Sequence, residues 1–353
     1  MAEKNYLYRA VAFVLFIAIS LLLLVEGKSF LAPLTLAAIL SLLILPVAQK
    51  LEHFKLNRTL ASLSSTLILF IISCGFFVLV TAQMNEMVEK WGAMKDVIKP
   101  KVEMATQFIT QNTPVTEKKL EGYKSKITNF KFIGTANGGS GALTYLGKLI
   151  GFLGMYLLVF IYVFFMLRFR TKFKKFLLKF FSKEKNKEVK KTIRQTISVA
   201  QGYLLGKLKL IAILALIYGI GLGISGVSNF FLIALIAAAL TIIPYLGNIM
   251  GYSLALIFGY LIDGELGILI GVTITFVVSQ FVESYILQPY VVGKDVDLNP
   301  LFVILAVILG NMIWGIIGMV VAIPVLGIIN VIFLHIPSLK PFGFLMSRET
   351  DKN

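Results

Sequence analysis

Long apolar runs recur along the whole chain. Most contain about 18 residues or more, roughly the number that an α-helix needs to cross ~30 Å of hydrocarbon. The short alternating strands of about ten residues that are typical of outer-membrane barrels do not occur. The pattern therefore predicts an all-α integral membrane protein with about eight membrane segments. The apolar runs occupy residues 11–25, 30–47, 60–81, 146–167, 208–227, 230–261, 266–287 and 301–334.

Polar stretches between these runs divide the chain into parts. In one stretch Met84, Met87, Trp91 and Met94 recur at helical spacing, which favours a small helical insert outside the membrane. We expect N-terminal transmembrane helices in residues 1–82, an extracytoplasmic helical insert in 83–147, a transmembrane helix in 148–167, a basic cytoplasmic amphipathic segment in 168–206, a C-terminal transport core in 207–336 and a cytoplasmic tail in 337–353.

The charge distribution indicates an orientation. The chain is 58% apolar and 15% charged, and its net charge of +16 comes from 34 basic and 18 acidic residues. Cytoplasmic loops of membrane proteins collect Lys and Arg. Residues 168–194 hold twelve basic residues against two acids, whereas residues 83–147 mix both signs. We therefore expect a multi-pass protein of the bacterial inner (plasma) membrane with both termini in the cytoplasm.

The basic segment interleaves its cations with phenylalanines, as a helix on an anionic leaflet does. Its lipid-facing candidates are Lys172, Lys174, Lys175 and Lys179. Two interpretations stay open: a loop that is basic only because it is cytoplasmic, and a specific site for anionic lipids or a partner. Nucleic-acid binding is not expected, because the membrane already explains the charge.

Two of the apolar runs are interrupted near their middle. The run 230–261 contains Pro244, Tyr245, Gly247 and Asn248, and the run 301–334 contains Gly310, Asn311 and Gly315. Leu-Gly-Asn occurs in both breaks. The arms before the breaks would rise only ~20 Å as helices, which predicts re-entrant hairpins. The run 266–287 crosses the membrane once between the two hairpins. The hairpins are therefore expected to enter the membrane from opposite faces and to form an inverted repeat.

Such breaks point to a transport site. Non-helical backbone in a bilayer is costly unless protein, water or a ligand satisfies its polar groups, and paired breaks in two repeats indicate a binding site. The alternative is that these glycines only let helices pack closely.

One acid lies inside an apolar run. Glu283 stands near the end of 266–287, and Gln280 shares its face by i,i+3 spacing. A carboxylate in the membrane is a candidate relay for protons or cations, whereas at headgroup level it would only cap or anchor the helix. Cys74 is the only cysteine, and His53 and His335 are far apart, so no metal site and no cofactor are expected.

The C-terminal half resembles the AI-2E transporter family. The likeness is carried, in the family's order, by Pro244-Tyr245-Leu246-Gly247, Glu283 to Gln288-Pro289, Gly293-Lys294, Leu298-Asn299-Pro300, Gly310 to Gly315, and Gly318 to Pro324. The resemblance implies eight membrane segments, a homo-oligomer for which a pentamer is one candidate, and export of small molecules such as autoinducer-2, the signal of quorum sensing. Some relatives resemble sodium(lithium)/proton antiporters. Asn248, Asn299 and Lys207 depart from the family's usual residues.

Four classes of function fit parts of this pattern. The first is a secondary exporter of a small polar solute, and the second is a cation/proton antiporter that uses Glu283. The third, an intramembrane protease, rests only on a Gly-x-Ser-Gly match at residues 138–141, which lies in a hydrophilic stretch without a partner histidine. The chain has no P-loop for direct ATP-driven pumping. A scaffold or regulatory protein would tolerate changes at both breaks. We expect a transporter and not an enzyme.

Overall fold

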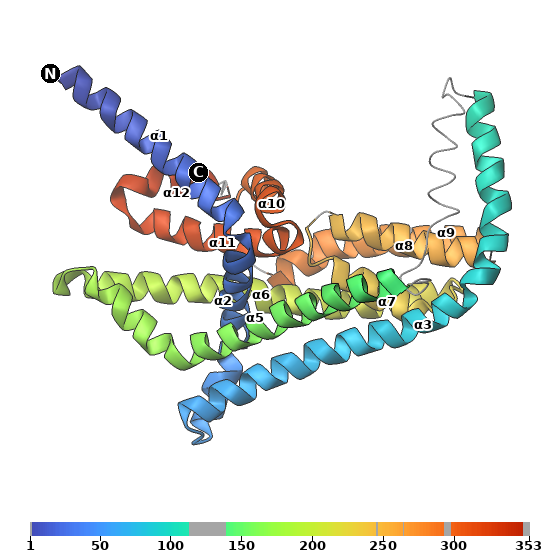
Figure 1. Cartoon of the computed structure of the whole chain (residues 1–353), viewed down its shortest axis with the longest axis horizontal. Helices are drawn as coiled ribbons and strands as arrows, with labels where there is room; N and C mark the ends of the chain where they lie inside the picture. The colour runs from blue at the N-terminus through green and yellow to red at the C-terminus, as the bar shows by residue number, and fades with distance from the viewer. Residues whose placement is uncertain (1, 113–138, 245, 264, 293–297, 349–353) are drawn as a thin grey trace. The chain divides into compact units, whose positions relative to one another are not determined.

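The computed structural model describes residues 2–112, 139–244, 246–263, 265–292 and 298–348. Part of the predicted insert, Tyr245 and the Gly293-Lys294 pair lie outside these residues. In the described part the secondary structure is helical and contains no strand (Figure 1). The helices are α1 (Ala2–Glu26), α2 (Lys28–His53), α3 (Arg58–Asn112), α5 (Gly139–Lys179), α6 (Asn186–Ile224), α7 (Phe230–Leu240), α8 (Leu246–Asp263), α9 (Leu266–Val282), α10 (Pro300–Trp314), α11 (Ile316–His335) and α12 (Lys340–Met346), with η1 (Lys183–Lys185), η2 (Glu283–Val292) and η3 (Pro337–Leu339) between them.

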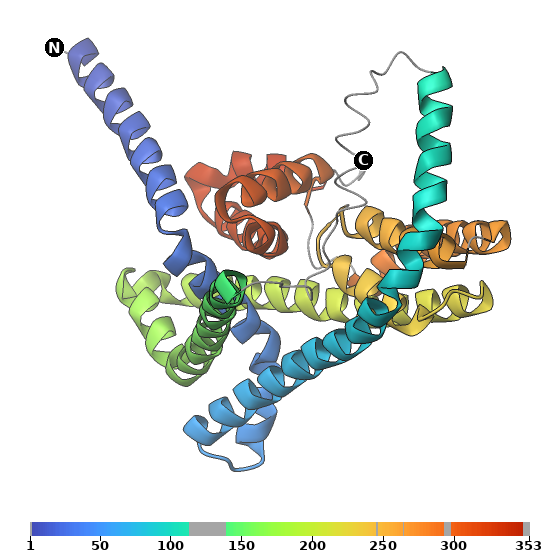
Figure 2. The same ribbon diagram turned by 45° about the vertical axis from the view of Figure 1, so that its right-hand side comes forward.

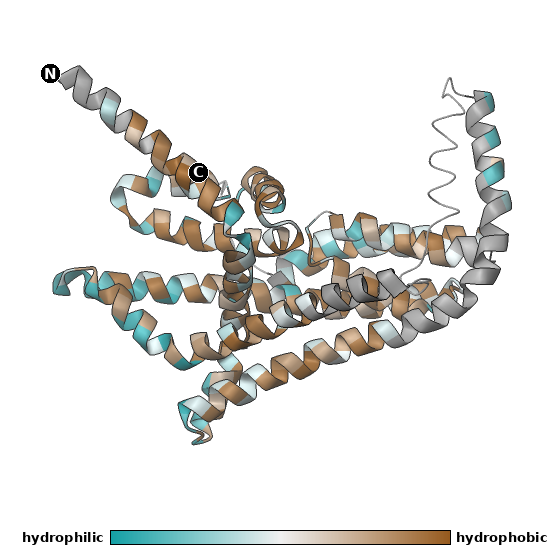
Figure 3. Ribbon diagram, viewed as in Figure 1, coloured by the Kyte–Doolittle hydropathy of each residue, from teal (hydrophilic) through white to brown (hydrophobic). Residues whose placement is uncertain are grey.

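The membrane class predicted from the apolar runs is confirmed. Among the described residues six helical stretches are long and apolar enough to span a bilayer, and four shorter apolar helices accompany them. Figure 3 shows the apolar residues along these helices and hydrophilic residues where α5 meets α6. Counted as α1, α2, α3, α5, α6, α9 and the two helix pairs α7–α8 and α10–α11, the elements match the eight predicted segments.

Two membrane helices are longer than predicted. Helix α3 continues through residue 81 to Asn112, into the predicted insert, and α5 continues to Lys179, into the predicted basic segment. Residues 168–179 contain no Gly or Pro, and Lys, Leu and Arg are good helix formers, so nothing there ends the helix. The polar parts of the chain therefore begin as extensions of membrane helices.

The chain forms two compact units. The first comprises residues 1–70, 153–208 and 289–353, and the second comprises residues 71–152 and 209–288. In the first unit α2 packs on α5 through small and branched residues, with Ala37 and Ala48 fully buried beside Val163. Small side chains allow the two helices to approach closely.

An ion cluster joins three helices of the first unit at their polar ends. Arg170 of α5 bonds Glu52 of α2, and the Nε atom of Arg58, at the start of α3, lies 3.7 Å from the same carboxylate. Arg58 also donates to the Thr171 hydroxyl at 2.8 Å. The basic end of this unit thus includes an acid that balances part of its charge and fixes the helix ends.

Helices α10 and α11 form a hairpin within the first unit. Gly315 joins them with a φ of 61°, a left-handed conformation that glycine adopts without strain. Near the turn Gly310 faces Gly318, and a Cβ atom on either residue would overlap the carbonyl oxygen of the other. The two backbones are therefore in direct contact. Trp314, the last residue of α10, donates from Nε1 to the Leu24 carbonyl of α1 at 2.9 Å.

Helices α7 and α8 form the second hairpin, in the second unit. Helix α7 has 11 residues, about 16 Å, and the turn after it contains Pro244. Gly247 lies against the Leu240 carbonyl, and Gly251 lies against Ala237. Helix α8 also packs beside α9 (Figures 1 and 2). Both interrupted runs therefore fold into helical hairpins, as the sequence predicted.

The breaks lie at different points of the two hairpins. Gly247 and Asn248 belong to the first turn of α8, after the bend, whereas Gly310 and Asn311 belong to the end of α10, before it. The shared Leu-Gly-Asn tripeptides are thus not structurally equivalent. In each hairpin the glycine serves a close backbone contact, which is the packing role that the sequence left open. Entry of the hairpins from opposite faces stays a prediction.

Candidate functional site

A cluster of amide and carboxyl groups lies in the second unit, where the start of α8 meets the end of α9. The Nδ2 atom of Asn248 donates to Oε1 of Gln280 and, at 3.0 Å, to Oε2 of Glu283. Gln280 and Glu283 thus share a face, as their spacing predicted. The Glu283 residue is only 3% exposed. Its carboxyl group is therefore buried in protein and held by a hydrogen bond, which is how buried polar groups are tolerated.

Tyr218 of α6 completes the cluster from a third helix. Its hydroxyl donates to Oδ1 of Asn248 at 3.5 Å, and its ring stacks on Phe276 of α9 with centroids 4.6 Å apart. Tyr218 was not among the predicted site residues. The sequence offers only a weak indication of this role. Tyr218 is a tyrosine within an apolar run, and a buried tyrosine hydroxyl usually needs a hydrogen-bond partner. The Asn248 amide thus connects Tyr218 with Gln280 and Glu283.

The local backbone explains how Gln280 and Glu283 are placed. Helix α9 ends at Val282, and Glu283 begins the π-helical η2. Pro289 lies within η2 and has no N–H to donate, so regular α-helical bonding cannot continue there. Gln280 also donates from Nε2 to the Ser284 hydroxyl at 3.0 Å. The π-helical segment η2 begins with Glu283 and therefore determines where this acid lies. Short π-helical segments are often found at functional sites.

Electrostatically the cluster pairs an acid with a neutral amide. Asn248 supplies a hydrogen bond to the Glu283 carboxylate. A carboxylate held in this way can take up a proton or a cation, or bind a hydroxyl group of a solute. The cluster is therefore suited to binding a polar or positively charged species.

The other predicted site residues that the structure describes lie in the α7–α8 hairpin, in η2 and in the hairpin of the first unit. Pro244 lies in the turn before α8, and Gln288 is exposed near the end of η2. Gly310, Asn311 and Gly315 belong to the hairpin of the first unit. The Asn311 carbonyl accepts the Gly315 N–H at 2.9 Å, and the Asn311 side chain is exposed. That both breaks face one passage stays a prediction.

The predicted lipid-facing lysines lie on the polar end of α5. Lys172, Lys174, Lys175 and Lys179 are all exposed. Phenylalanines of the same stretch are exposed between them, and Lys172 Nζ lies 5.4 Å from the centroid of the Phe169 ring. Apolar rings and cations thus share one solvent-accessible surface, the composition of a helix at a membrane interface.

The described residues contain no group of three or more His, Cys, Asp or Glu side chains that could hold a metal ion. Cys74 is the only cysteine of the chain, so it forms no disulfide within it, and it is half-buried.

Comparison with known proteins gives one consistent result. The profile of a family described as AI-2E family transporter matches residues 11–338. Two proteins of Bacillus subtilis (strain 168) are similar over part of their length. "Putative transport protein YrrI" is 32% identical over 133 residues, which are 38% of this chain and 37% of that protein. "Putative transport protein YueF" is 31% identical over 134 residues, 38% of this chain and 36% of that protein. These alignments span just over a third of either relative.

Proposed function

The chain belongs to the AI-2E transporter family, and from that premise we propose that it is a secondary transporter, not an enzyme, which exports a small polar solute of the autoinducer-2 kind across the bacterial inner membrane. The observation that carries the proposal is the hydrogen-bonded cluster of Asn248, Gln280 and Glu283, joined to Tyr218, in which Glu283 is buried and Gln280 is exposed. Convergent amide, carboxyl and hydroxyl groups of this kind can hydrogen-bond a small polar solute.

Binding would exchange hydrogen bonds within the cluster for hydrogen bonds to the solute. Asn248 donates from Nδ2 to two acceptors on the same neighbouring segment. A solute hydroxyl can donate to Glu283 or Gln280, and a solute carbonyl can accept from Asn248. The cluster can therefore release its internal bonds one at a time, which limits the cost of binding and of release. A short helical hairpin that carries one side of the site is typical of secondary transporters.

A second candidate function is sodium(lithium)/proton antiport. It is favoured by Glu283, whose buried carboxyl group accepts a hydrogen bond from Asn248. A proton or an alkali cation could neutralise this carboxylate in turn, and such competition couples the two flows. This mechanism requires the charge of Glu283, whereas export of a neutral solute requires mainly the hydrogen bonds.

Transport in proteoliposomes tests both functions. Efflux of autoinducer-2 and sodium-dependent proton exchange are measured after a pH jump for the wild type, Glu283→Gln and Asn248→Leu. Asn248→Leu removes all three hydrogen bonds of this side chain, and we expect it to lower solute efflux by roughly 10-fold or more. Antiport predicts that Glu283→Gln abolishes sodium–proton exchange. Glu265→Gln, at an exposed acid just before α9, is the matched control.

Each result has a distinct meaning. Unchanged efflux in Asn248→Leu, with normal amounts of folded protein, would refute the cluster as the solute site. Equal exchange in the wild type and Glu283→Gln would remove Glu283 from any antiport mechanism. Loss of both activities in Glu265→Gln would indicate a general effect of removing acids and would contradict both assignments.

We also propose that the polar end of α5 binds anionic lipids and lies in the cytoplasm, and that the chain works as a homo-oligomer. The lipid contact is supported by the exposed set of four lysines with interleaved phenylalanines. Each Lys near an anionic surface contributes about 1 kcal/mol. Replacing Lys172, Lys174, Lys175 and Lys179 by Gln should remove the extra thermal stability that phosphatidylglycerol gives over phosphatidylcholine. The same four changes to Arg keep the charge and should retain it; equal loss in both variants would contradict a charge-based contact.

A further inference from the structure

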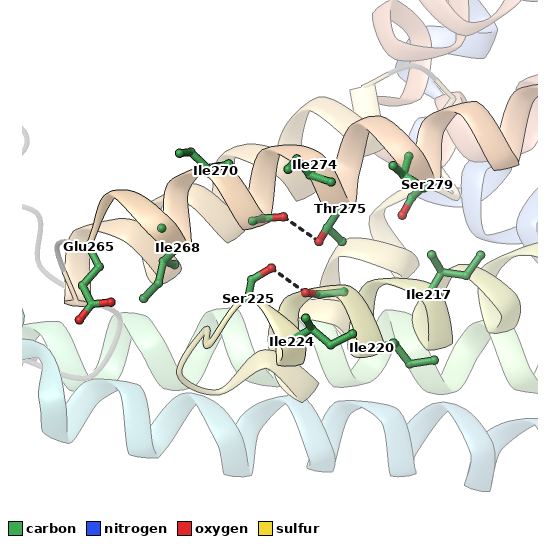
Figure 4. Close-up of a pocket in the computed structure, with 14 residues that line it drawn as sticks. Ile217, Ile220, Ile224, Ser225, Glu265, Ile268, Ile270, Ile274, Thr275 and Ser279 are labelled. Atoms are coloured by element: carbon green, nitrogen blue, oxygen red, sulfur yellow. Dashed lines mark hydrogen bonds between the residues drawn. The ribbon is translucent and has the colours of Figure 1, made fainter.

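A groove of about 770 Å³ lies between the second half of α6 and α9, within the second unit (Figure 4). The two helices approach closely at two points, where Gly221 lies against Thr275 and Gly271 lies against Ser225. The walls beside these contacts are mostly isoleucines, and Ile224 and Ile274 are 84% and 57% exposed. Both helices contribute to candidate membrane spans, so the groove opens toward hydrocarbon.

Three hydroxyl groups line this apolar groove, and two of them are satisfied locally. Ser225 donates to the Gly221 carbonyl at 2.6 Å, and Thr275 donates to the Gly271 carbonyl at 2.8 Å. These are the usual bonds of a helical hydroxyl to the carbonyl four residues earlier. Figure 4 shows both as dashed lines. Neither hydroxyl therefore needs a ligand.

Ser279 differs from the other two. It is fully buried, and its Oγ atom has no hydrogen-bond partner, although the residue lines the same groove. Figure 4 shows its hydroxyl on the side of α9 that faces α6. A buried hydroxyl without a partner is costly, and such groups in native proteins usually mark a bound water, an ion or a ligand. The Ser279 hydroxyl therefore indicates a hydrogen-bond acceptor that is supplied from outside the chain.

The depth of Ser279 limits what can supply that acceptor. Within the candidate span from Leu266 to Gln288, Ser279 lies about 20 Å from the first residue and about 13 Å from the last. Phospholipid carbonyls stay in the interfacial region of the bilayer and do not reach this depth. An ordinary acyl chain could fill the apolar groove but would leave the Ser279 hydroxyl unpaired.

We propose that the α6–α9 groove binds an elongated apolar molecule that carries a hydrogen-bond acceptor, such as a carbonyl, within its chain, and that Ser279 donates to this acceptor. The volume of the groove is within the usual range of small-molecule sites, about 300–1,000 Å³. Isoleucine side chains contact the apolar body of the ligand, and Ser279 sets its register. The ligand differs from the polar solute of the Asn248 cluster, so this site stands independently of the proposed transport function.

Photolabelling in proteoliposomes tests this site directly. The reagents are a long-chain ketone with a mid-chain carbonyl and a terminal diazirine, and the matching alkane with the same diazirine. Labelled peptides are located by mass spectrometry. We expect the ketone to label the groove segments 217–225 and 265–279 roughly 2- to 10-fold more than the alkane, the range of one neutral hydrogen bond.

Three variants complete the design. Ser279→Ala should lower ketone labelling to the level of the alkane. Ser225→Ala removes a hydroxyl of the same groove that is already satisfied, and it should keep the preference for the ketone. Ile274→Trp fills the groove and should lower labelling by both reagents.

Any of three results would overturn the proposal. Equal labelling of the wild type by ketone and alkane means that the groove accepts any apolar chain. Equal effects of Ser225→Ala and Ser279→Ala mean that Ser279 has no special role. Absence of label from both segments means that something else, such as a second copy of this chain, occupies the groove.

Discussion

At the scale of single residues, Asn248 holds the candidate site together. One amide group donates to Gln280 and Glu283 and accepts from Tyr218, so three helical segments meet at one side chain. This arrangement uses both amide hydrogens and the carbonyl oxygen of Asn248. Any ligand of the cluster must compete with these bonds. Binding and the packing of α6 on α8 and α9 are therefore linked through Asn248.

Tyr218 contributes mainly through its ring. Its bond to Asn248 is long, 3.5 Å, whereas its ring is buried and stacked on Phe276. We expect Tyr218→Phe to change the free energy of unfolding by about 1 kcal/mol or less, and Tyr218→Ala to lower it by about 3–5 kcal/mol because a cavity remains. Thermal unfolding in detergent checks both values. Tyr290→Ala, at an exposed tyrosine, should have little effect. Equal losses in the Phe and Ala variants of Tyr218 would contradict the dominance of the ring.

At the scale of elements, the two hairpins show how apolar runs are interrupted by only a short break in helical hydrogen bonding. Each bend is short, and glycine then allows the two arms to contact each other through the backbone. Within hydrocarbon there is no hydrophobic gain from pressing apolar helices together, so close van der Waals contact drives their pairing. Adding a methyl group at the contact point should therefore destabilise the hairpin by more than the small volume of a methyl group would indicate.

Gly318 provides the sharpest test of this contact. A Cβ atom at Gly318 would overlap the backbone of Gly310, which cannot move away as a side chain could. Gly318→Ala should lower the free energy of unfolding by about 1–3 kcal/mol. Gly154→Ala, on an open face of α5, should be neutral or stabilising by up to ~1 kcal/mol, because alanine favours helix. Melting temperatures from size-exclusion chromatography of heated samples compare the two. If both variants melt alike, the hairpin does not depend on this contact.

At the scale of the whole molecule, the order of membrane-spanning helices and hairpins determines on which side of the membrane each connecting segment lies. The span from Leu266 to Gln288 lies between the two hairpins in the sequence. If neither hairpin crosses the bilayer, the base of the first lies outside and the base of the second lies in the cytoplasm. Helix α11 has 20 residues, enough to span by itself, so this arrangement needs a direct test.

Accessibility to an impermeant maleimide tests the arrangement. In a Cys74→Ser background, Glu265→Cys and Ser338→Cys place single thiols at exposed positions near the two bases. We expect Glu265→Cys to react in intact cells and Ser338→Cys to react only after permeabilisation, because one span separates them. Reaction of both thiols from the same side would exclude entry of the hairpins from opposite faces.

The sequence by itself determined the membrane class, the two hairpins, and the shared face of Gln280 and Glu283. These features depend on apolar run length, on Gly and Pro positions and on i,i+3 spacing, all of which are local along the chain. The tertiary structure decided that Asn248 meets Glu283, that Tyr218 joins them, that Gly310 faces Gly318, and that Ser279 lacks a partner although Ser225 and Thr275 have one. Most of these features depend on which helix faces which and at what register. Apolar periodicity cannot specify that register where lipid and protein interior are equally apolar.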